Sequence, residues 1–398
     1  MKCMIFICVA GSLCAVSAQV TAGQAQSDRH AGVTSASPAA YVYVSFTPAN
    51  SSVNEIAGYE AATNGALAPL PASPYTADVA SMAANGKYLF GANVNGVYID
   101  AYHIALNGAL SLWSQTDVAA FNAQDCGSSG SLVLDHTGAT LYDLDYRDDG
   151  CANTDYRSLA VVSSNGSLTN LAATRGNNWL TGPITFLANN IYAYAASCDS
   201  NMYWGIWGYR RQSNGILADL PAFTRALPAA KSGDFWCPML PSADPANHVA
   251  IVMQPVVGST FAADGGARIA SFTADAGGNL STTNTHAQMP VSSVGTPLDT
   301  RMAPNGKLLA VGGTAGLQIF RFNGADAPTH RTGLLAYVEI DQMYWDNQNH
   351  LYAISKPAGK LFVFTITPTS VSQAPGSPHA ITGPQDLIVQ PLPLPRAQ

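Results

Sequence analysis

Charged side chains are scarce in this 398-residue chain. Asp, Glu, Lys and Arg together make up 11% of the residues, and the formal net charge is −7. No basic stretch of the kind that follows a phosphate backbone is present, which excludes a nucleic-acid partner. Small and turn-forming residues replace the missing charge, including 35 glycines. This composition is typical of an exported β-rich protein whose tight turns use Asn-Gly.

Long apolar runs are missing beyond the N-terminus, so no transmembrane segment is expected. Residues 3–16 form an uncharged apolar run that follows Lys2 and precedes the small-residue triplet Val16-Ser17-Ala18. This pattern predicts a signal peptide over residues 1–18 and a periplasmic or extracellular protein, with a buried N-terminal helix as the alternative. Residues 19–38 show no alternation, which predicts a disordered lead-in.

Familiar catalytic motifs are also lacking. The sequence has no Gly-x-Ser-x-Gly elbow, phosphate-binding loop, dinucleotide-binding glycine motif, His-Glu-x-x-His or EF-hand loop. No cofactor and no resident metal are therefore expected, although a divalent cation in a central channel is an alternative. Any active site must be assembled from residues far apart in the sequence.

Internal repeats supply the positive evidence. An Asn-Gly turn recurs at residues 63–67, 106–110, 164–168 and 213–217, and a looser copy lies at 277–280. Asn-Gly tolerates the positive φ angles of tight hairpins, and an alternating β-type segment precedes each copy. A second hairpin recurs upstream, with 302–310 echoing 82–90. The period of about 45 to 60 residues matches a four-stranded propeller blade.

The repeats predict an all-β, seven-bladed β-propeller of four-stranded antiparallel blades over residues 39–395. Seven equivalent strands are found, at residues 41–46, 88–92, 141–146, 191–195, 249–253, 308–312 and 351–355. The first unit lacks its innermost strand, while residues 386–390 form a β-type segment with no unit after it. We therefore expect the C-terminal strand to close the ring. An open array of sandwiches is the alternative.

Several stretches resemble the lactonase-type seven-bladed β-propeller family, which includes 6-phosphogluconolactonase-like and Tyr-Val-Thr-Asn repeat proteins. They are Tyr-Val-Tyr-Val at 41–44, the strand and turn at 56–67, Ser-Pro-Tyr at 73–75 and Ser-Pro-His at 377–379. The resemblance implies the propeller fold and a lactone-opening activity. However, the stretch at 123–128 lacks the histidine that such members carry, and a phosphorylated sugar lactone is a cytosolic metabolite.

The seven cysteines reduce to four once the signal peptide is removed: Cys126, Cys151, Cys198 and Cys237. An even number in an oxidising compartment favours disulfides, and no pair has the close spacing of zinc ligands. Four cysteines allow three pairings. The simplest joins Cys126 to Cys151 and Cys198 to Cys237, which ties down loops at the channel mouth.

Polar residues gather in the segments expected around that mouth. Asp299 and Arg301 alternate by two, so they share one strand face, and Asp341 lies near the start of another innermost strand; these are the catalytic candidates. The candidates for ligand binding are Asp78, Arg175, Trp179, Asp234, Trp236 and Asp386. The recurring acids have a simpler explanation, the capping of backbone amides at blade junctions.

Two functions follow from this set. The first is a monomeric binding or scaffold protein of the cell envelope, whose partner is a small polar ligand, a glycan or an envelope protein. The second is a lactonase-like hydrolase in which Asp299 or Asp341 activates water and Arg301 polarises the carbonyl. Release of acid from a lactone panel distinguishes them.

Overall fold

The structure is a computed structural model that describes residues 38–118, 131–144, 156–174, 184–198, 204–220, 223–367 and 369–392. The predicted signal peptide and nearly all of the predicted lead-in lie outside these residues. Within the described ranges there is no helix with the length and apolarity needed to cross a membrane.

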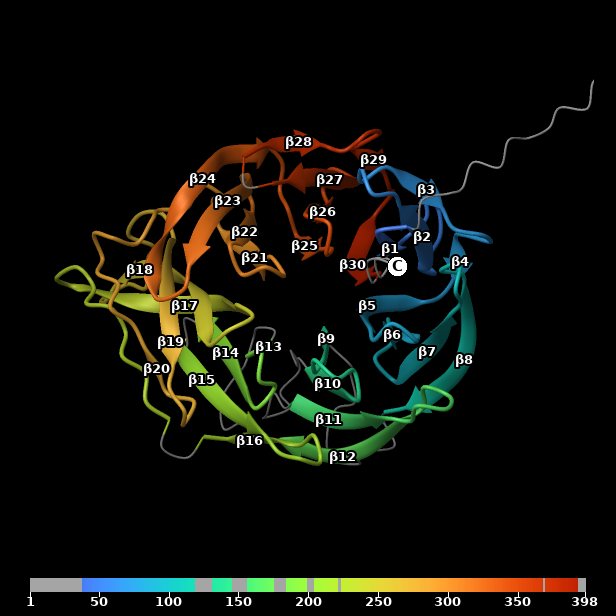
Figure 1. The fold of residues 1–398 in the computed structure, drawn as a ribbon, viewed down its shortest axis with the longest axis horizontal. Coiled ribbons are helices and arrows are strands. Elements are labelled where there is room, and N and C mark those ends of the chain that lie inside the picture. Colours follow the sequence, from blue (N-terminus) through green and yellow to red (C-terminus); the bar gives the residue numbers. More distant parts are fainter. Residues whose placement is uncertain are drawn as a thin grey trace, which may run out of the picture. The chain divides into compact units, whose positions relative to one another are not determined.

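The described strands form seven antiparallel sheets that circle a common axis (Figure 1), so the predicted seven-bladed β-propeller is confirmed. From the innermost strand outward, blade 1 contains β30 (Pro384–Pro391), β1 (Ala40–Phe46), β2 (Glu55–Ala61) and β3 (Leu67–Pro69), and blade 2 contains β5 (Val79–Ala84), β6 (Tyr88–Asn93), β7 (Tyr98–Ile104) and β8 (Leu110–Asp117). Blade 3 contains β9 (Ser131–Leu134), β10 (Thr140–Leu144), β11 (Tyr156–Val161) and β12 (Leu168–Thr174), and blade 4 contains β13 (Thr185–Phe186), β14 (Tyr192–Cys198), β15 (Trp204–Arg211) and β16 (Leu217–Asp219).

The remaining blades follow the same order. Blade 5 contains β17 (Asp234–Ala243), β18 (His248–Val257), β19 (Arg268–Ala274) and β20 (Leu280–Ser281), and blade 6 contains β21 (Pro297–Met302), β22 (Leu308–Gly313), β23 (Gly316–Asn323) and β24 (Asp326–Ala336). Blade 7 contains β25 (Gln342–Trp345), β26 (His350–Ser355), β27 (Lys360–Ile366) and β28 (Val371–Gln373). Two short strands, β4 (Tyr75–Thr76) and β29 (His379–Ala380), pair with β2 and β27.

The C-terminal strand closes the ring, as the repeats predicted. β30 pairs antiparallel with β1, so that Val42 lies opposite Val389 and Val44 opposite Leu387. These four side chains are buried in the cluster that joins blades 1 and 7. Burial of each Val or Leu side chain stabilises the fold by about 1.5–3 kcal/mol, so the closing strand contributes a large share of the stability of the first blade.

The Asn-Gly turns connect neighbouring blades as well as neighbouring strands. In two of them and in the looser copy at 277–280, the glycine carbonyl accepts a hydrogen bond from a buried tyrosine of the preceding blade: Gly108 from Tyr43 at 2.7 Å, Gly215 from Tyr142 at 2.6 Å and Gly278 from Tyr194 at 2.8 Å. At Gly108, where φ is 78°, a Cβ atom would lie 2.6 Å from the Tyr41 ring. The turn therefore needs glycine both for its backbone angle and for the close approach of blade 1.

Candidate functional site

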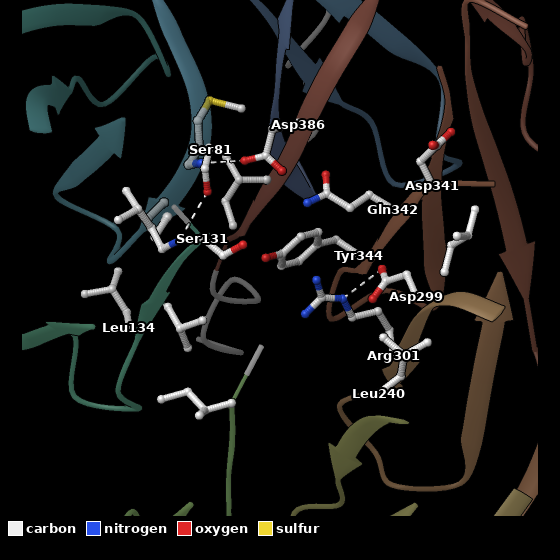
Figure 2. A pocket seen from close by; sticks show the side chains of 18 of the residues that line it. Ser81, Ser131, Leu134, Leu240, Asp299, Arg301, Asp341, Gln342, Tyr344 and Asp386 are labelled. Atoms are coloured by element: carbon white, nitrogen blue, oxygen red, sulfur yellow. Dashed lines mark hydrogen bonds and ion pairs between the residues drawn. The ribbon is translucent and has the colours of Figure 1, made fainter. Parts of the chain in front are cut away.

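The innermost strands surround a central cavity of about 430 Å³ (Figure 2). Side chains from six of these strands, β30, β5, β9, β17, β21 and β25, line it. Blades 3, 4 and 5 contribute apolar residues to the lining, which include Leu132, Leu134, Ile184 and Leu240. The charged residues of the lining come from blades 6, 7 and 1. The cavity therefore offers a ligand both an apolar surface and a set of charged or hydrogen-bonding groups.

A ring of hydrogen bonds, which we call the belt, joins successive innermost strands around this cavity. Within the described ranges, at every junction except that between blades 3 and 4, a side chain of one blade accepts a hydrogen bond from a backbone amide of the next. Among the described residues the belt acceptors and their donors are Ser81 with Leu132 (3.1 Å), Thr185 with Ala243 (3.1 Å), Ser242 with Met302 (2.8 Å), Asp299 with Met343 (2.7 Å), Gln342 with Leu387 (2.8 Å) and Asp386 with Met82. An unpaired buried amide costs about 1–3 kcal/mol, so the belt stabilises the closed ring.

The belt has a regular register that blade 6 breaks. In blades 1, 2, 5 and 7 the acceptor immediately precedes the residue whose amide donates to the previous blade. In blade 6 the donor is Met302, so Arg301 occupies the acceptor position. A guanidinium has no acceptor atom. Asp299, two residues earlier on the same strand face, takes over and accepts the hydrogen bond from Met343.

The Arg301 side chain therefore takes no part in the belt and lines the cavity. Its Nε donates to Asp299 Oδ2 at 3.1 Å, and its guanidinium carbon lies 4.3 Å from the centre of the Tyr344 ring. Burial alone lowers the pKa of Arg301, but the charge of Asp299 outweighs this and holds the pKa above its ordinary value. Figure 2 shows the guanidinium and the Tyr344 hydroxyl directed into the cavity. Arg301 is thus a fixed cation in the cavity wall.

Asp386 faces the same space from blade 1. Its side chain is buried, and burial raises its pKa to about 6, although hydrogen bonds from the Gln342 side chain and the Met82 amide lower it in part. Burial also raises the pKa of Tyr344, which keeps this phenol neutral. A carboxylate that titrates near neutral pH, a neutral phenol and a permanent cation are the groups that acid–base chemistry on a carbonyl compound requires.

The other acidic candidates have structural partners. Asp341 lines the cavity, but its Oδ2 accepts a hydrogen bond from the Lys356 amide at 2.7 Å and so caps the loop after β26. Asp78 is not part of the cavity lining; its Oδ1 accepts a hydrogen bond from the Asn54 amide at 3.1 Å.

The candidates of blade 5 lie away from the cavity. Asp234 is adjacent to Asp264, which pairs with Lys231 at 2.7 Å; burial and a hydrogen bond with Asp264 raise the pKa of Asp234. Trp236 is buried, and its Nε1 donates to the Pro228 carbonyl at 2.9 Å. Both residues therefore have local contacts that account for them. Arg175 and Trp179 lie outside the described residues.

One of the two predicted disulfides is confirmed. Cys198 at the end of β14 is bonded to Cys237 in β17, with 5.1 Å between their Cα atoms. The bond joins blades 4 and 5. Cys126 and Cys151 lie outside the described residues, so their pairing stays a prediction. The part of the chain that the structure describes contains no group of three His, Cys, Asp or Glu side chains placed to hold a metal ion.

Sequence reasoning placed Gln342 beside Asp341 at the channel mouth but missed Tyr344 and Ser81 as cavity residues. Gln342 and Tyr344 alternate by two on β25, as Asp299 and Arg301 do on β21. That alternation was a signal that could have found Tyr344, because residues i and i+2 share a strand face.

Comparison with protein-family models and with curated proteins gives no match. Solved structures do match. A protein from Bacteroides fragilis, provisionally described as a 6-phosphogluconolactonase, is 13% identical over 89% of this chain and 99% of its own, with a TM-score of 0.63. The periplasmic gluconolactonase of Pseudomonas aeruginosa is 15% identical over 89% and 99%, with a TM-score of 0.62. A hypothetical selenium-binding protein from Sulfolobus tokodaii is 10% identical over 89% and 94%, with a TM-score of 0.58. At these identities the likeness shows the fold alone.

Proposed function

We propose that the protein hydrolyses a neutral lactone in its central cavity. The observation that carries this proposal is Arg301, a cation placed at a belt position where it cannot serve the belt. Asp386 lines the same cavity from blade 1, and burial raises its pKa to about 6. The lactonase names of two structural neighbours support the same reaction.

The reaction needs a base, an oxyanion site and water. The Asp386 carboxylate takes a proton from a water molecule while the oxygen of that water attacks the lactone carbonyl carbon. Arg301 stabilises the resulting oxyanion, and the neutral Tyr344 hydroxyl donates a hydrogen bond beside it. The ring C–O bond then breaks, and the leaving alkoxide receives the proton from Asp386. Lactone and water are converted to a hydroxy acid with no other reactant.

The charge of the cavity favours a neutral substrate. Arg301 is already paired with Asp299, and Asp341 and Asp386 add negative charge, while Lys356 is the one further cation that the described residues contribute to the lining. A phosphorylated lactone would therefore meet little net positive charge. We also propose that the protein works outside the cytosol, which the periplasmic neighbour and the disulfide support.

The test is acid release from a panel of sugar and aliphatic lactones, followed at constant pH. Since the base acts only when ionised, kcat/KM should rise with pH, reach half of its maximum at about pH 6 and level off above that. Asp386→Asn should lose at least about 100-fold in rate and this pH dependence. The variant keeps an oxygen that can accept the Met82 hydrogen bond, so the belt is preserved. Asp234→Asn, an acid outside the cavity, is the matched control. No turnover across the panel contradicts the proposal.

A second candidate is a binding protein for the same class of molecule. It is favoured by one observation: Asp299 and Asp386 both accept belt hydrogen bonds, so each already has a structural role. Such a protein would bind a lactone or its hydroxy acid through Arg301 and Tyr344 without turnover. Calorimetric titration of the wild-type chain, with no acid release in the same samples, would identify it.

A further inference from the structure

A second cavity, of about 670 Å³, lies on the outer part of blade 6. Its lining comes from β22, β23, β24 and the turn before β22, and none of its residues lines the central cavity. We call it the blade 6 groove. It is therefore separate from the proposed catalytic site, and each of the two sites could hold its own ligand at the same time.

The groove concentrates positive charge in an acidic chain. Lys307, Arg321 and Arg331 line it together with a single acid, Asp326. The side chain of Asp326 is held by a 2.9 Å hydrogen bond from Asn323. Since the chain as a whole carries a net charge of −7, three cations around one groove are unusual and attract an anionic ligand.

These cations have few partners of their own. Among the described residues, neither Lys307 nor Arg321 forms an ion pair, and both side chains are exposed. Arg331 donates from Nη2 to the Thr367 carbonyl at 3.3 Å, while its Nε is buried with no hydrogen-bond partner in that part of the chain. The exposed donors of Lys307 and Arg321 are therefore available to a ligand that carries carboxylate groups.

The rest of the lining fits a sugar. Leu308 and Phe322 are buried on opposite faces of blade 6, so the partly exposed Ala327 is the apolar side chain of the lining against which the C–H face of a sugar ring can pack. Asn305 uses its Oδ1 to accept the Lys307 amide at 2.9 Å, which leaves its side-chain N–H groups for hydroxyls. We infer that the blade 6 groove binds an acidic oligosaccharide, a short chain of sugars that carry carboxylate groups.

The experiment titrates the full chain with tri-galacturonate and with neutral galactotriose, using calorimetry at low ionic strength. Tri-galacturonate should bind at least tenfold more tightly, and its affinity should fall as salt is added. The Lys307→Ala/Arg321→Ala double variant should bind tri-galacturonate at least tenfold more weakly. Arg210→Ala, an exposed arginine on blade 4, is the matched control and should bind as the wild type does.

Several outcomes would overturn the inference. They are equal affinity for galactotriose, full affinity in the double variant, and equally tight binding of inorganic phosphate or of a polyglutamate peptide, since these would show that no sugar is recognised. Thermal unfolding checks that the double variant is folded. Lactone hydrolysis should be unchanged in it, so the groove and the proposed catalytic function succeed or fail separately.

Discussion

Blades 5 and 6 make the same junction with the next blade in two different ways. In blade 5 the neutral Ser242 hydroxyl accepts a hydrogen bond from the Met302 amide at 2.8 Å. In blade 6 the corresponding position is Arg301, and the ionised Asp299 both accepts the Met343 amide and holds the arginine. In blade 6 the carboxylate of an ion pair therefore does what one neutral hydroxyl does in blade 5.

The difference identifies which part of blade 6 is not required by the fold. A junction needs one acceptor, and a serine provides it without any buried charge. An ion pair in the same place has a desolvation cost that its mutual attraction offsets only in good geometry. The Asp299–Arg301 pair thus has a desolvation cost that a serine would avoid, and Arg301 adds nothing to the belt, while it places a cation in the cavity. This is the pattern expected of a functional residue.

Replacing the ion pair of blade 6 with a neutral junction like that of blade 5 tests whether the two junctions differ only in function. The Asp299→Asn/Arg301→Ser variant has a neutral junction with an acceptor for Met343. We expect the free energy of unfolding to stay within about 1 kcal/mol of the wild type or to rise, because neutral replacement of a buried pair is often harmless. Lactone hydrolysis should fall at least about 100-fold, since the oxyanion donor is gone.

Denaturant unfolding and acid release measure the two expectations on the same samples. Ser81→Ala, which also touches both the belt and the cavity, is the control; its hydrolysis should change little because it carries no charge. Wild-type activity in the double variant would show that the cation has no role in the reaction.

The single variant Arg301→Ser tests whether Asp299 depends on its cation for stability. It leaves Asp299 ionised without its cation, so we expect a loss of about 2 kcal/mol in the free energy of unfolding. This is less than the roughly 3–5 kcal/mol found for fully buried pairs, because the Arg301 side chain is 29% exposed. Urea unfolding of this variant and of Asp299→Asn/Arg301→Ser provides the measurement. Equal stability of the two variants would mean that Asp299 does not need a partner.

Much of this fold could be predicted because its signals are local. An Asn-Gly turn needs a positive φ whatever surrounds it, and a strand shows its alternation within a few residues. Closure by β30 followed from counting strands. The explanation that the recurring acids cap amides at blade junctions holds for Asp299 and Asp386.

The site could be predicted only in part because it depends on blade packing. The residues joined by the Asp386–Met82 bond are 304 positions apart, and no local pattern indicates which amide meets which side chain. Asp234 illustrates the difficulty. It begins β17, as a candidate acid should, but the belt residue of that strand is Ser242 near the other end. Asp234 and Ser242 lie near opposite ends of β17, so their side chains are at different heights in the channel, and the sequence does not show these heights.

The smallest expected effect belongs to blade 5. Ser242→Ala leaves the Met302 amide without its acceptor, so we expect the free energy of unfolding to fall by about 1 kcal/mol. Lactone hydrolysis should not change, because Ser242 does not line the central cavity. Ser242→Thr keeps the hydroxyl and should restore the stability, which separates the hydrogen bond from a loss of packing. A large loss of activity in Ser242→Ala, with Ser242→Thr active, would instead show that the belt itself positions Arg301. The junction in blade 5 would then not be purely structural, and its contrast with the functional junction in blade 6 would be wrong.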